Sequence, residues 1–363
     1  MTTVSIILKV VDYCNFNCSF CRYTLQKNTS PLKMTSSLAE ECLRKGALYN
    51  IESGNSYIHI IFHGGEPLLW GYDNFKKIFK FEDDFKKEYP DFIFYNSIQT
   101  NGSLLTPQLL NLFIKYNVSI GISIDGPEKI NYHKPDGDYD GILSKLEMLN
   151  NSNCNYGILS VITNSHKNKA IDYYKFIIDN QIKSVGLCYC FDPIGNASVD
   201  NEVLSDFLIE LFDLYFFGSY KMRIREFDSV IEKYLGLCSS NCNFRCREKC
   251  GDYFSIFPDG KILFCDSYEY KSEPLGNIMA ANFNDIKKTD KYKNIISDLS
   301  KNFESNCKNC SILHLCGGGC FRNDMINGKN YFCKAYEKTY MHIANVINQF
   351  RKEEQANERI GCN

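Results

Sequence analysis

The feature of this 363-residue chain that most limits its fold is a repeated alternation of apolar and amphipathic stretches over residues 5–190. The apolar stretches are short and rich in β-branched residues, as buried parallel strands are, and the amphipathic ones are long enough to form helices. The expected strands are residues 5–11, 57–63, 92–99, 118–124, 155–163 and 184–190. The expected helices are residues 34–51, 72–89, 107–116, 140–150 and 168–180. Six strands joined by right-handed helical crossovers predict an α/β fold, an open (β/α)6 barrel of the TIM type.

The second half of the chain has a different character. Residues 203–217 and 224–235 predict helices, and a cysteine-dense region follows from about Cys238. Pro258-Asp259-Gly260-Lys261 separates two strand-like stretches and predicts a hairpin. Residues 334–350 predict an amphipathic helix that ends in a frayed polar tail. The expected domains are a barrel at 1–195, bridging helices at 196–240, a cysteine-rich domain at 241–335, and a C-terminal helix and tail at 336–363.

Charge and cysteine usage limit the partners and the compartment. The 41 basic and 43 acidic residues are interspersed, so neither a nucleic-acid nor a membrane footprint is expected. No stretch has the composition of a signal peptide or a membrane span, which predicts a cytoplasmic protein. Eighteen cysteines in such a chain indicate metal ligation rather than disulfides. Exposed iron-sulfur clusters are sensitive to oxygen, so an anaerobic or microaerobic host is implied.

Three cysteines follow the first expected strand with the spacing Cys14-x3-Cys18-x2-Cys21. Zinc or an electron-transfer cluster would require a fourth protein ligand, and no Cys or His follows within a few residues. Three thiolates can hold three irons of a 4Fe-4S cube and leave the fourth iron open to a substrate. The loop also lies at the carboxyl end of a strand, where βα barrels place their chemistry. The alternative is three cysteines that merely share a loop.

Polar motifs close three further expected strands. His63-Gly64-Gly65-Glu66-Pro67 closes the second strand, where the glycines allow close backbone approach to a ligand and Glu66 offers a carboxylate. Gln99-Thr100-Asn101-Gly102 closes the third strand and Ser123-Ile124-Asp125-Gly126-Pro127 closes the fourth. Turn chemistry at strand ends is the alternative explanation.

The cysteine triplet together with Gly64-Gly65-Glu66-Pro67 resembles the radical S-adenosylmethionine (SAM) superfamily. The resemblance implies that SAM chelates the open iron and is cleaved to a 5'-deoxyadenosyl radical, which abstracts a hydrogen atom from the substrate. It also implies that the Gly-Gly-Glu-Pro loop holds the SAM amino group and that Ser123 contacts SAM. Asp125, Gln99 and Asn101 are further candidates for the SAM site.

The cysteine-rich half resembles the SPASM domain, which binds two auxiliary 4Fe-4S clusters in addition to the first. By position, the distal cluster would be held by Cys307, Cys310, Cys316 and Cys333, and the proximal one by Cys250, Cys265 and Cys320. Cys246 is the preferred fourth proximal ligand, with Cys242 or no protein ligand as alternatives. A zinc ribbon would need far fewer cysteines. No role is predicted for Cys42, Cys154, Cys188, Cys190 and Cys362, and the first four are expected to be buried.

Cys265-Asp266 and Cys316-Gly317-Gly318-Gly319-Cys320 resemble anaerobic sulfatase maturases most closely. In that family Asp266 would be the catalytic base, and turn capping is the alternative. Two departures exist: the glutamine that touches substrate is His63 here, and the SAM-binding arginine falls near Lys134-Pro135. The departures favour a sibling group, the maturases of ribosomally made peptides.

We therefore expect a radical SAM/SPASM enzyme that forms thioether or carbon-carbon crosslinks in a peptide, or epimerises it. A sulfatase maturase that makes formylglycine from Cys or Ser is the second hypothesis. A non-catalytic electron carrier explains neither the open triplet nor the glycine loop. The expected cofactors are three 4Fe-4S clusters and SAM. The expected partners are a peptide or protein substrate and an electron donor such as flavodoxin or ferredoxin.

Overall fold

The computed structural model describes residues 3–21, 31–131, 138–192, 198–239, 241–244, 250–266, 273–323 and 329–361, without the side chains of residues 302 and 354–361. The chain forms two compact units. The first unit comprises residues 1–159, 180–182 and 249–298, and the second comprises 160–179, 183–248 and 299–363. The domain boundaries expected from composition remain a prediction.

The first unit is built on parallel strands that follow one another in chain order. They are β1 (Ser5–Val11), β2 (Tyr57–Gly64), β3 (Ile93–Thr100), β4 (Ser119–Ser123) and the first part of β5 (Tyr156–Ile162). The connecting helices are η1 (Pro67–Trp70), α2 (Ser36–Glu52), α3 (Tyr72–Glu88), α4 (Pro107–Lys115) and α5 (Tyr139–Asn150). These elements confirm the predicted alternation.

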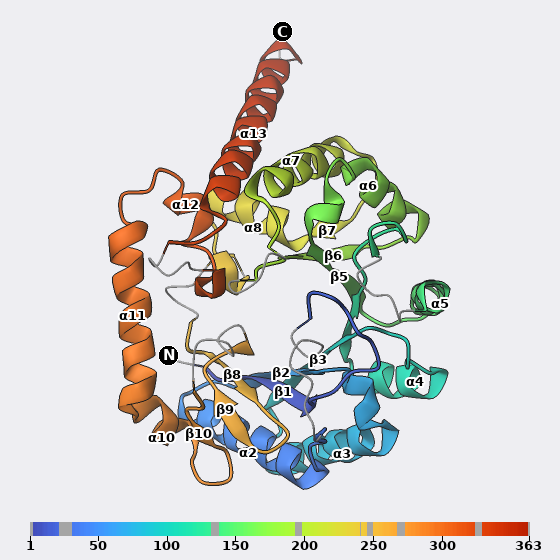
Figure 1. The fold of residues 1–363 in the computed structure, drawn as a ribbon, viewed down its shortest axis with the longest axis vertical. Helices are drawn as coiled ribbons and strands as arrows, with labels where there is room; N and C mark the ends of the chain where they lie inside the picture. Colours follow the sequence, from blue (N-terminus) through green and yellow to red (C-terminus); the bar gives the residue numbers. More distant parts are fainter. Residues whose placement is uncertain are drawn as a thin grey trace. The chain divides into compact units, whose positions relative to one another are not determined.

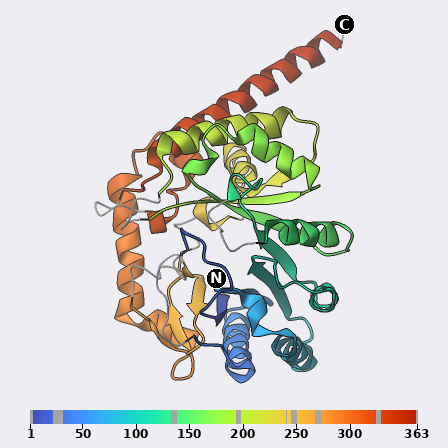
Figure 2. The same cartoon turned by 45° about the vertical axis from the view of Figure 1, so that its right-hand side comes forward.

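Helices α2, α3 and α4 cover one face of these strands (Figure 1, Figure 2). Helix α2 packs closely through Gly46, where a Cβ atom would lie 2.6 Å from Ile58 Cδ1 and 2.8 Å from Ile6 Cδ1. Successive side chains of a strand point to opposite faces. Lys9 and His63 therefore project from the face opposite α2, which is the interior face of the open barrel.

The cysteine-rich half contributes strands to the same sheet. They are β8 (Tyr253–Ile256), β9 (Lys261–Leu263) and β10 (Gly276–Asn277). The predicted hairpin is confirmed, because β8 and β9 are antiparallel. Strand β8 also pairs in parallel with β1, with Ser255 opposite Ile7, and this pairing was not predicted. The sheet of the unit thus runs β10-β9-β8-β1-β2-β3-β4-β5.

Among the described residues of the cysteine-rich half, two consecutive helices between β10 and the last cysteines were missed. They are α10 (Phe283–Lys288) and α11 (Asp290–Asn306), whose last residues belong to the second unit. The cap of α10 was visible in the sequence, since Asn282 and Asp285 form a reciprocal capping box. Helix α11 places Leu299 and Phe303 four residues apart, and both are buried.

The second unit contains the end of β5 and strands β6 (Ser184–Tyr189) and β7 (Arg223–Ile224), which are parallel. Its helices are α6 (Ala170–Asp179), α7 (Asn201–Phe217), α8 (Arg225–Tyr234), α12 (Leu313–Cys316) and α13 (Cys333–Gly361), with short turns η3 (Asn164–His166), η4 (Cys242–Phe244) and η6 (Phe321–Asn323). Helix α13 runs along α7 (Figure 1), and His342 Nε2 lies 2.7 Å from Asp213 Oδ1.

The predicted end of the last helix was wrong. The helix was expected to stop at residue 350 and fray, but α13 continues to Gly361. Residues 351–360 are mainly strong helix formers, with neither Pro nor Gly among them, so nothing local ends the helix earlier.

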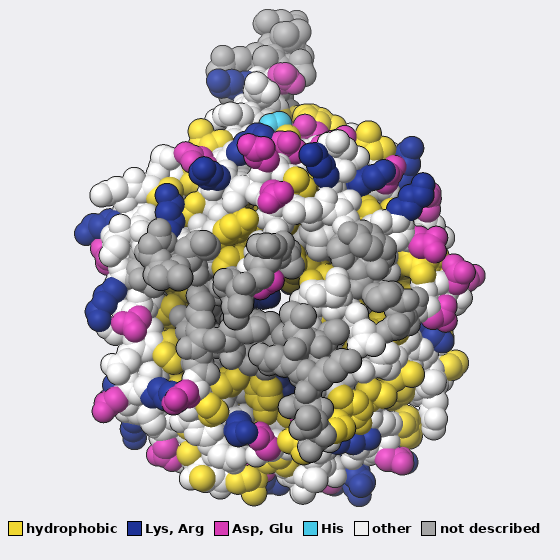
Figure 3. All heavy atoms as spheres, viewed as in Figure 1, with side chains coloured by type: hydrophobic (Ala, Val, Ile, Leu, Met, Phe, Trp, Pro, Cys, Tyr) yellow, Lys and Arg dark blue, Asp and Glu magenta, His cyan; other side chains and the backbone are white. Residues whose placement is uncertain are grey.

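The surface carries charges of both signs. On the face shown in Figure 3, basic and acidic side chains of the described residues are interspersed around the rim. Within the described ranges, no helix combines the length and the hydrophobicity that crossing a membrane would require.

Candidate functional site

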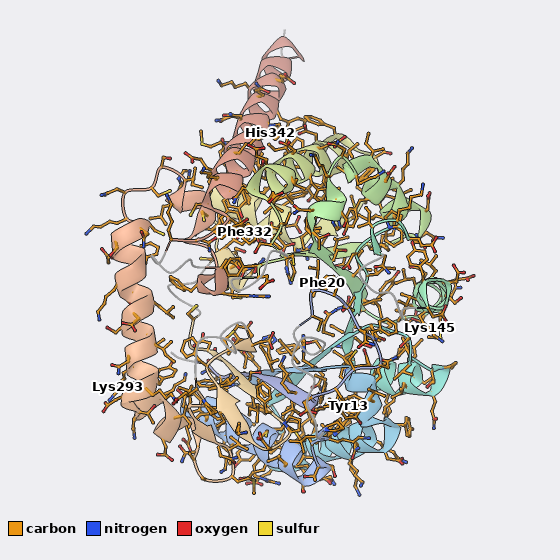
Figure 4. All side chains as sticks on the ribbon, viewed as in Figure 1. Tyr13, Phe20, Lys145, Lys293, Phe332 and His342 are labelled. Carbon is orange, nitrogen blue, oxygen red and sulfur yellow. The ribbon has the colours of Figure 1, made fainter. Side chains whose placement is uncertain are left out.

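The cysteine triplet lies on the loop that leaves β1. Figure 4 labels Tyr13 and Phe20 on this loop. The backbone N–H of Cys21 donates to the Cys18 carbonyl at 3.0 Å, which closes a turn between these two cysteines. The Phe16 N–H lies 3.4 Å from Cys14 Sγ and donates to it. The loop therefore gathers its three cysteines within one compact turn region.

The Cys14 thiol is half-buried. Burial raises its pKa to about 11, and the nearby Glu66 and Cys21 act in the same direction, against the hydrogen bonds from Phe16 and Asn101. A raised pKa favours the protonated thiol. Bound iron would favour the thiolate instead, because a metal deprotonates a coordinating thiol.

The glycine pair of the second motif lies against this loop. Gly64 has φ +134°, and a Cβ atom there would collide with the Val11 carbonyl oxygen. At Gly65 a Cβ atom would collide with the Tyr13 carbonyl oxygen. The Gly65 N–H donates to Val11 O and the Glu66 N–H donates to Tyr13 O, both at 3.0 Å. The glycines are therefore required for contact between the two loops.

Glu66 is buried, with 1% of its surface exposed. Its Oε1 accepts hydrogen bonds from the Leu68 N–H at 2.9 Å and the Thr100 hydroxyl at 2.6 Å, and Oε2 accepts from the Asn101 N–H at 2.8 Å. Burial raises the pKa of this carboxyl to about 6. The side chain thus ties the glycine loop to the end of β3, and its contact with SAM remains a prediction.

Asn101 links the end of β3 to the cysteine loop. Its Nδ2 donates to Asn15 Oδ1 at 3.0 Å and lies 3.9 Å from Cys14 Sγ. Its Oδ1 accepts from the backbone N–H and the hydroxyl of Ser103 at 2.9 and 2.7 Å. Three of the predicted motifs therefore meet at one place in the first unit.

Gln99 and Ser123 form a second pair. Gln99 Nε2 donates to Ser123 Oγ at 2.7 Å across β3 and β4. Gly121 makes room for this pair, because a Cβ atom there would collide with Gln99 Oε1. Asp125 is buried, and its N–H donates to Asn131 Oδ1 at 3.1 Å. The predicted roles of these side chains toward SAM remain predictions.

Sequence reasoning missed Lys9, which contacts the predicted base. Lys9 is fully buried on β1, and its Nζ forms an ion pair with Asp266 Oδ1, whose side chain is 27% exposed. The same Nζ lies 3.3 Å from His63 Nδ1, and His63 stands opposite Lys9 on β2. A single lysine inside an apolar strand was the signal that could have identified it.

Cys316 lies within electrostatic reach of three other cysteines of the second unit. Burial, together with the nearby Cys333, Cys307 and Cys310, raises the pKa of the Cys316 thiol to about 12. These are the four residues predicted to hold the distal cluster. The three glycines after Cys316 all have positive φ, between 64° and 94°, which only glycine adopts without strain.

The residues predicted for the proximal cluster are divided between the units. Cys250 precedes β8 and Cys265 follows β9, so the antiparallel pairing places both at the open end of the hairpin. Cys320 belongs to the second unit.

Cys246 and Lys134-Pro135 lie outside the described residues, as does Cys362. Cys42 and Cys190 are buried as expected, whereas Cys154 and Cys188 are half-buried.

The donors predicted for these sites are cysteine thiols, the ligands that iron-sulfur clusters use. In the described ranges, no group of three or more His, Cys, Asp or Glu side chains is arranged to hold one metal ion. A four-iron cube binds each thiolate to a different iron, so its ligands stand farther apart than those of a single ion. The grouping around Cys316 and the compact Cys14 loop suit that requirement.

Comparison with known proteins gives matches to both halves of the chain. Residues 8–177 match the Radical SAM superfamily, and residues 246–311 match SPASM, an iron-sulfur cluster-binding domain. The cysteine-type anaerobic sulfatase-maturating enzyme of Clostridium perfringens is 27% identical over 97% of this chain and 100% of its own length. The radical SAM cyclopropyl synthase TigE of Paramaledivibacter caminithermalis is 28% identical over 87% of this chain and 67% of its own length.

A solved structure shares the fold over nearly the whole chain. The structure of native anSMEcpe with bound AdoMet and Cp18Cys peptide matches with a TM-score of 0.82 at 26% identity, and the match covers 96% of this chain and 99% of the other.

Proposed function

We propose that this chain, which belongs to the radical SAM superfamily and carries a SPASM domain, oxidises a cysteine side chain of a protein or peptide to formylglycine. The chain is an enzyme that uses SAM and several 4Fe-4S clusters. The substrate and the product are the proposed part. This choice reverses the order of the two hypotheses drawn from the sequence.

The residues that would hold these cofactors are the predicted ones. Cys14, Cys18 and Cys21 would hold the cluster that binds SAM, and Cys307, Cys310, Cys316 and Cys333 the distal auxiliary cluster. When bound, SAM and the clusters supply a hydrogen-abstracting radical and an acceptor for one electron. Asn101 and the glycine pair fix the loop on which this chemistry depends.

The step left to the chain's own side chains is removal of the thiol proton. Oxidation of a cysteine side chain to a thioaldehyde removes one hydrogen atom from Cβ, one proton from Sγ and one electron. Hydrolysis of the thioaldehyde by one water molecule then gives formylglycine and releases the sulfur as hydrogen sulfide. Asp266 is the base that we assign to the thiol proton, and its pairing with the Lys9 ammonium suits a carboxylate that must be ionised.

The observation that carries the proposal is similarity over the full length. The match to the Clostridium perfringens enzyme extends across both halves and leaves no part of that relative uncovered. Asp266, which follows the predicted ligand Cys265, is also in contact with a buried residue of the barrel. These two facts favour an activity that requires both halves.

The test is a reaction of the reconstituted chain with SAM, dithionite and a synthetic peptide that carries a cysteine in a sulfatase active-site sequence. We expect 5'-deoxyadenosine and a peptide in which the sulfur is replaced by a carbonyl oxygen, detected by mass spectrometry and by labelling with a hydrazide. Dithionite stands in for the proposed donor, a flavodoxin or ferredoxin. Formation of 5'-deoxyadenosine without the aldehyde would contradict the substrate assignment.

Maturation of a ribosomally made peptide is the second candidate, and His63 is the observation that favours it. The sulfatase maturases that this chain resembles carry glutamine at the position of His63. A relative of comparable identity is named a cyclopropyl synthase. This candidate predicts a product that retains its sulfur, either with two hydrogens lost in a thioether or carbon-carbon crosslink or, after epimerisation, with an unchanged mass. The same mass spectrum separates the two candidates. We also propose a cytoplasmic setting with little oxygen, since exposed clusters react with oxygen.

A further inference from the structure

Lys9 is an unusual residue for its position. Its neighbours on β1 are apolar, and its side chain has no exposed surface. A buried ammonium loses its hydration, and an ion pair in the interior offsets this loss only in part. Apolar side chains of similar volume in place of both members of such a pair would serve stability as well or better. The lysine therefore calls for an explanation other than stability.

The contacts of Lys9 join three separate segments of the first unit. The ammonium pairs with Asp266, which follows β9, and lies 3.3 Å from His63 Nδ1 at the end of β2. The Gly64 N–H also donates to His63 Nδ1, at 2.8 Å. Since both neighbours of Nδ1 are donors, Nδ1 carries the lone pair and the neutral ring bears its hydrogen on Nε2. Lys9 thus connects the Asp266 carboxylate to the loop that contains Gly64.

We propose that Lys9 is a positioning residue that holds Asp266 and His63 in one fixed arrangement for the reaction on substrate. The inference rests on the proposed function, because it acts through Asp266. A lysine ammonium has three donors and no acceptor, so a single side chain orients a carboxylate and an imidazole together. Loss of Lys9 leaves both groups in place but free to adopt other orientations. A displacement of about 1 Å costs on the order of 100-fold in rate.

The first test compares product with 5'-deoxyadenosine in the full, cluster-loaded chain. With the sulfatase-type cysteine peptide as the probe, Lys9→Met should retain iron and SAM cleavage, while product per 5'-deoxyadenosine falls by about 10- to 100-fold. Lys9→Arg retains a cation and should recover at least part of this loss. Lys45→Met is the matched control, because Lys45 is a half-buried lysine of the same unit that bonds instead to the carbonyl groups of Ile278 and Ala281. A loaded Lys9→Met with the wild-type ratio would overturn the proposal.

A double variant asks whether Lys9 acts through Asp266. Lys9→Met/Asp266→Asn should form no less product than Asp266→Asn alone, because residues that act as a unit do not give multiplied losses. Multiplied losses would show an independent role for Lys9 and would overturn the proposal.

Thermal melting of four proteins gives a readout that needs no substrate. They are the wild type, Lys9→Met, Asp266→Asn and the double variant. Asp266→Asn should lower Tm because it removes the negative charge that pairs with the buried Lys9 ammonium, and the added Lys9→Met should recover most of that loss. If the losses in Tm of the two single variants add up in the double variant, the proposed pairing of Lys9 with Asp266 is refuted. If the wild type makes no aldehyde, the proposed function fails, and the melting cycle alone then decides on Lys9. If Lys9→Met does not fold, Lys9→Gln takes its place in the product measurements and in the melting cycle.

Discussion

Glu82→Gln should stabilise the folded chain, and the gain should grow as the pH rises. Glu82 lies on α3 with 2% of its surface exposed, and its two carboxyl oxygens lie 3.0 and 2.9 Å from Asn96 Nδ2. Asn96 Oδ1 is buried and has no hydrogen-bond partner among the described residues. Burial raises the pKa of Glu82 to about 8. A protonated Glu82, or a glutamine, can donate to this oxygen once the Asn96 amide is turned over.

The size of the effect follows from proton linkage. The folded chain binds the Glu82 proton more tightly than the unfolded chain, where the pKa is about 4.5, so stability falls as the pH rises from about 4.5 to about 8 and is constant above. Each pH unit in this range costs about 1.4 kcal/mol. Between pH 5 and pH 9 the wild type should therefore lose about 4 kcal/mol through this group. Glutamine has no proton to lose, so the variant avoids this loss.

Urea unfolding of the reconstituted proteins at pH 5, 7 and 9 measures the difference directly. The gap between Glu82→Gln and wild type should widen with pH, while other titrating groups cancel in the comparison. Glu88→Gln is the control, because Glu88 is exposed at the end of the same helix. Parallel stability curves for wild type and Glu82→Gln would refute a protonated, buried Glu82.

Three further changes test the cluster assignments. Replacing Cys14, Cys18 and Cys21 by Ala should leave about eight of about twelve irons and abolish SAM cleavage, and retained cleavage would contradict the assignment. Gly65→Ala should lower the occupancy of that same cluster, since its methyl group collides with the cysteine loop; an unchanged iron count in the soluble variant would count against the contact. Cys246→Ala should lower iron content and alter the paramagnetic spectrum, whereas no change would favour Cys242 or an open site.

Local patterns were sufficient to predict the barrel elements. Strands β1 to β5 lie within one or two residues of their expected bounds, because apolar runs and their flanking turns are set by neighbouring residues. Thr35 caps α2, with its side chain accepting from the Leu38 N–H. The pairing of β8 with β1 could not be predicted from the sequence. The hairpin signal at residues 258–261 defines the two strands but not the neighbouring strand that they join.

The site was predictable where residues are close along the chain. The cysteine triplet and the glycine pair could be read from spacing, but the three hydrogen bonds of Glu66 depend on Thr100 and Asn101, which belong to another strand. The pair of Lys9 and Asp266 joins positions more than 250 residues apart in the sequence. A single sequence carries no signal for such a contact beyond the oddity of a lysine inside an apolar strand.

The pairing of β8 with β1 also limits how such a chain can be rearranged in evolution or in the laboratory. A chimera that takes its cysteine-rich half from another relative must supply a strand that fits beside β1, with a residue opposite Ile7 as Ser255 is here. A slip of one residue would reverse every side chain of the grafted strand. An unpaired β1 would become an exposed edge that invites aggregation. Strands β1 and β8 should therefore be inherited as one block, and crossovers that separate them should yield insoluble protein.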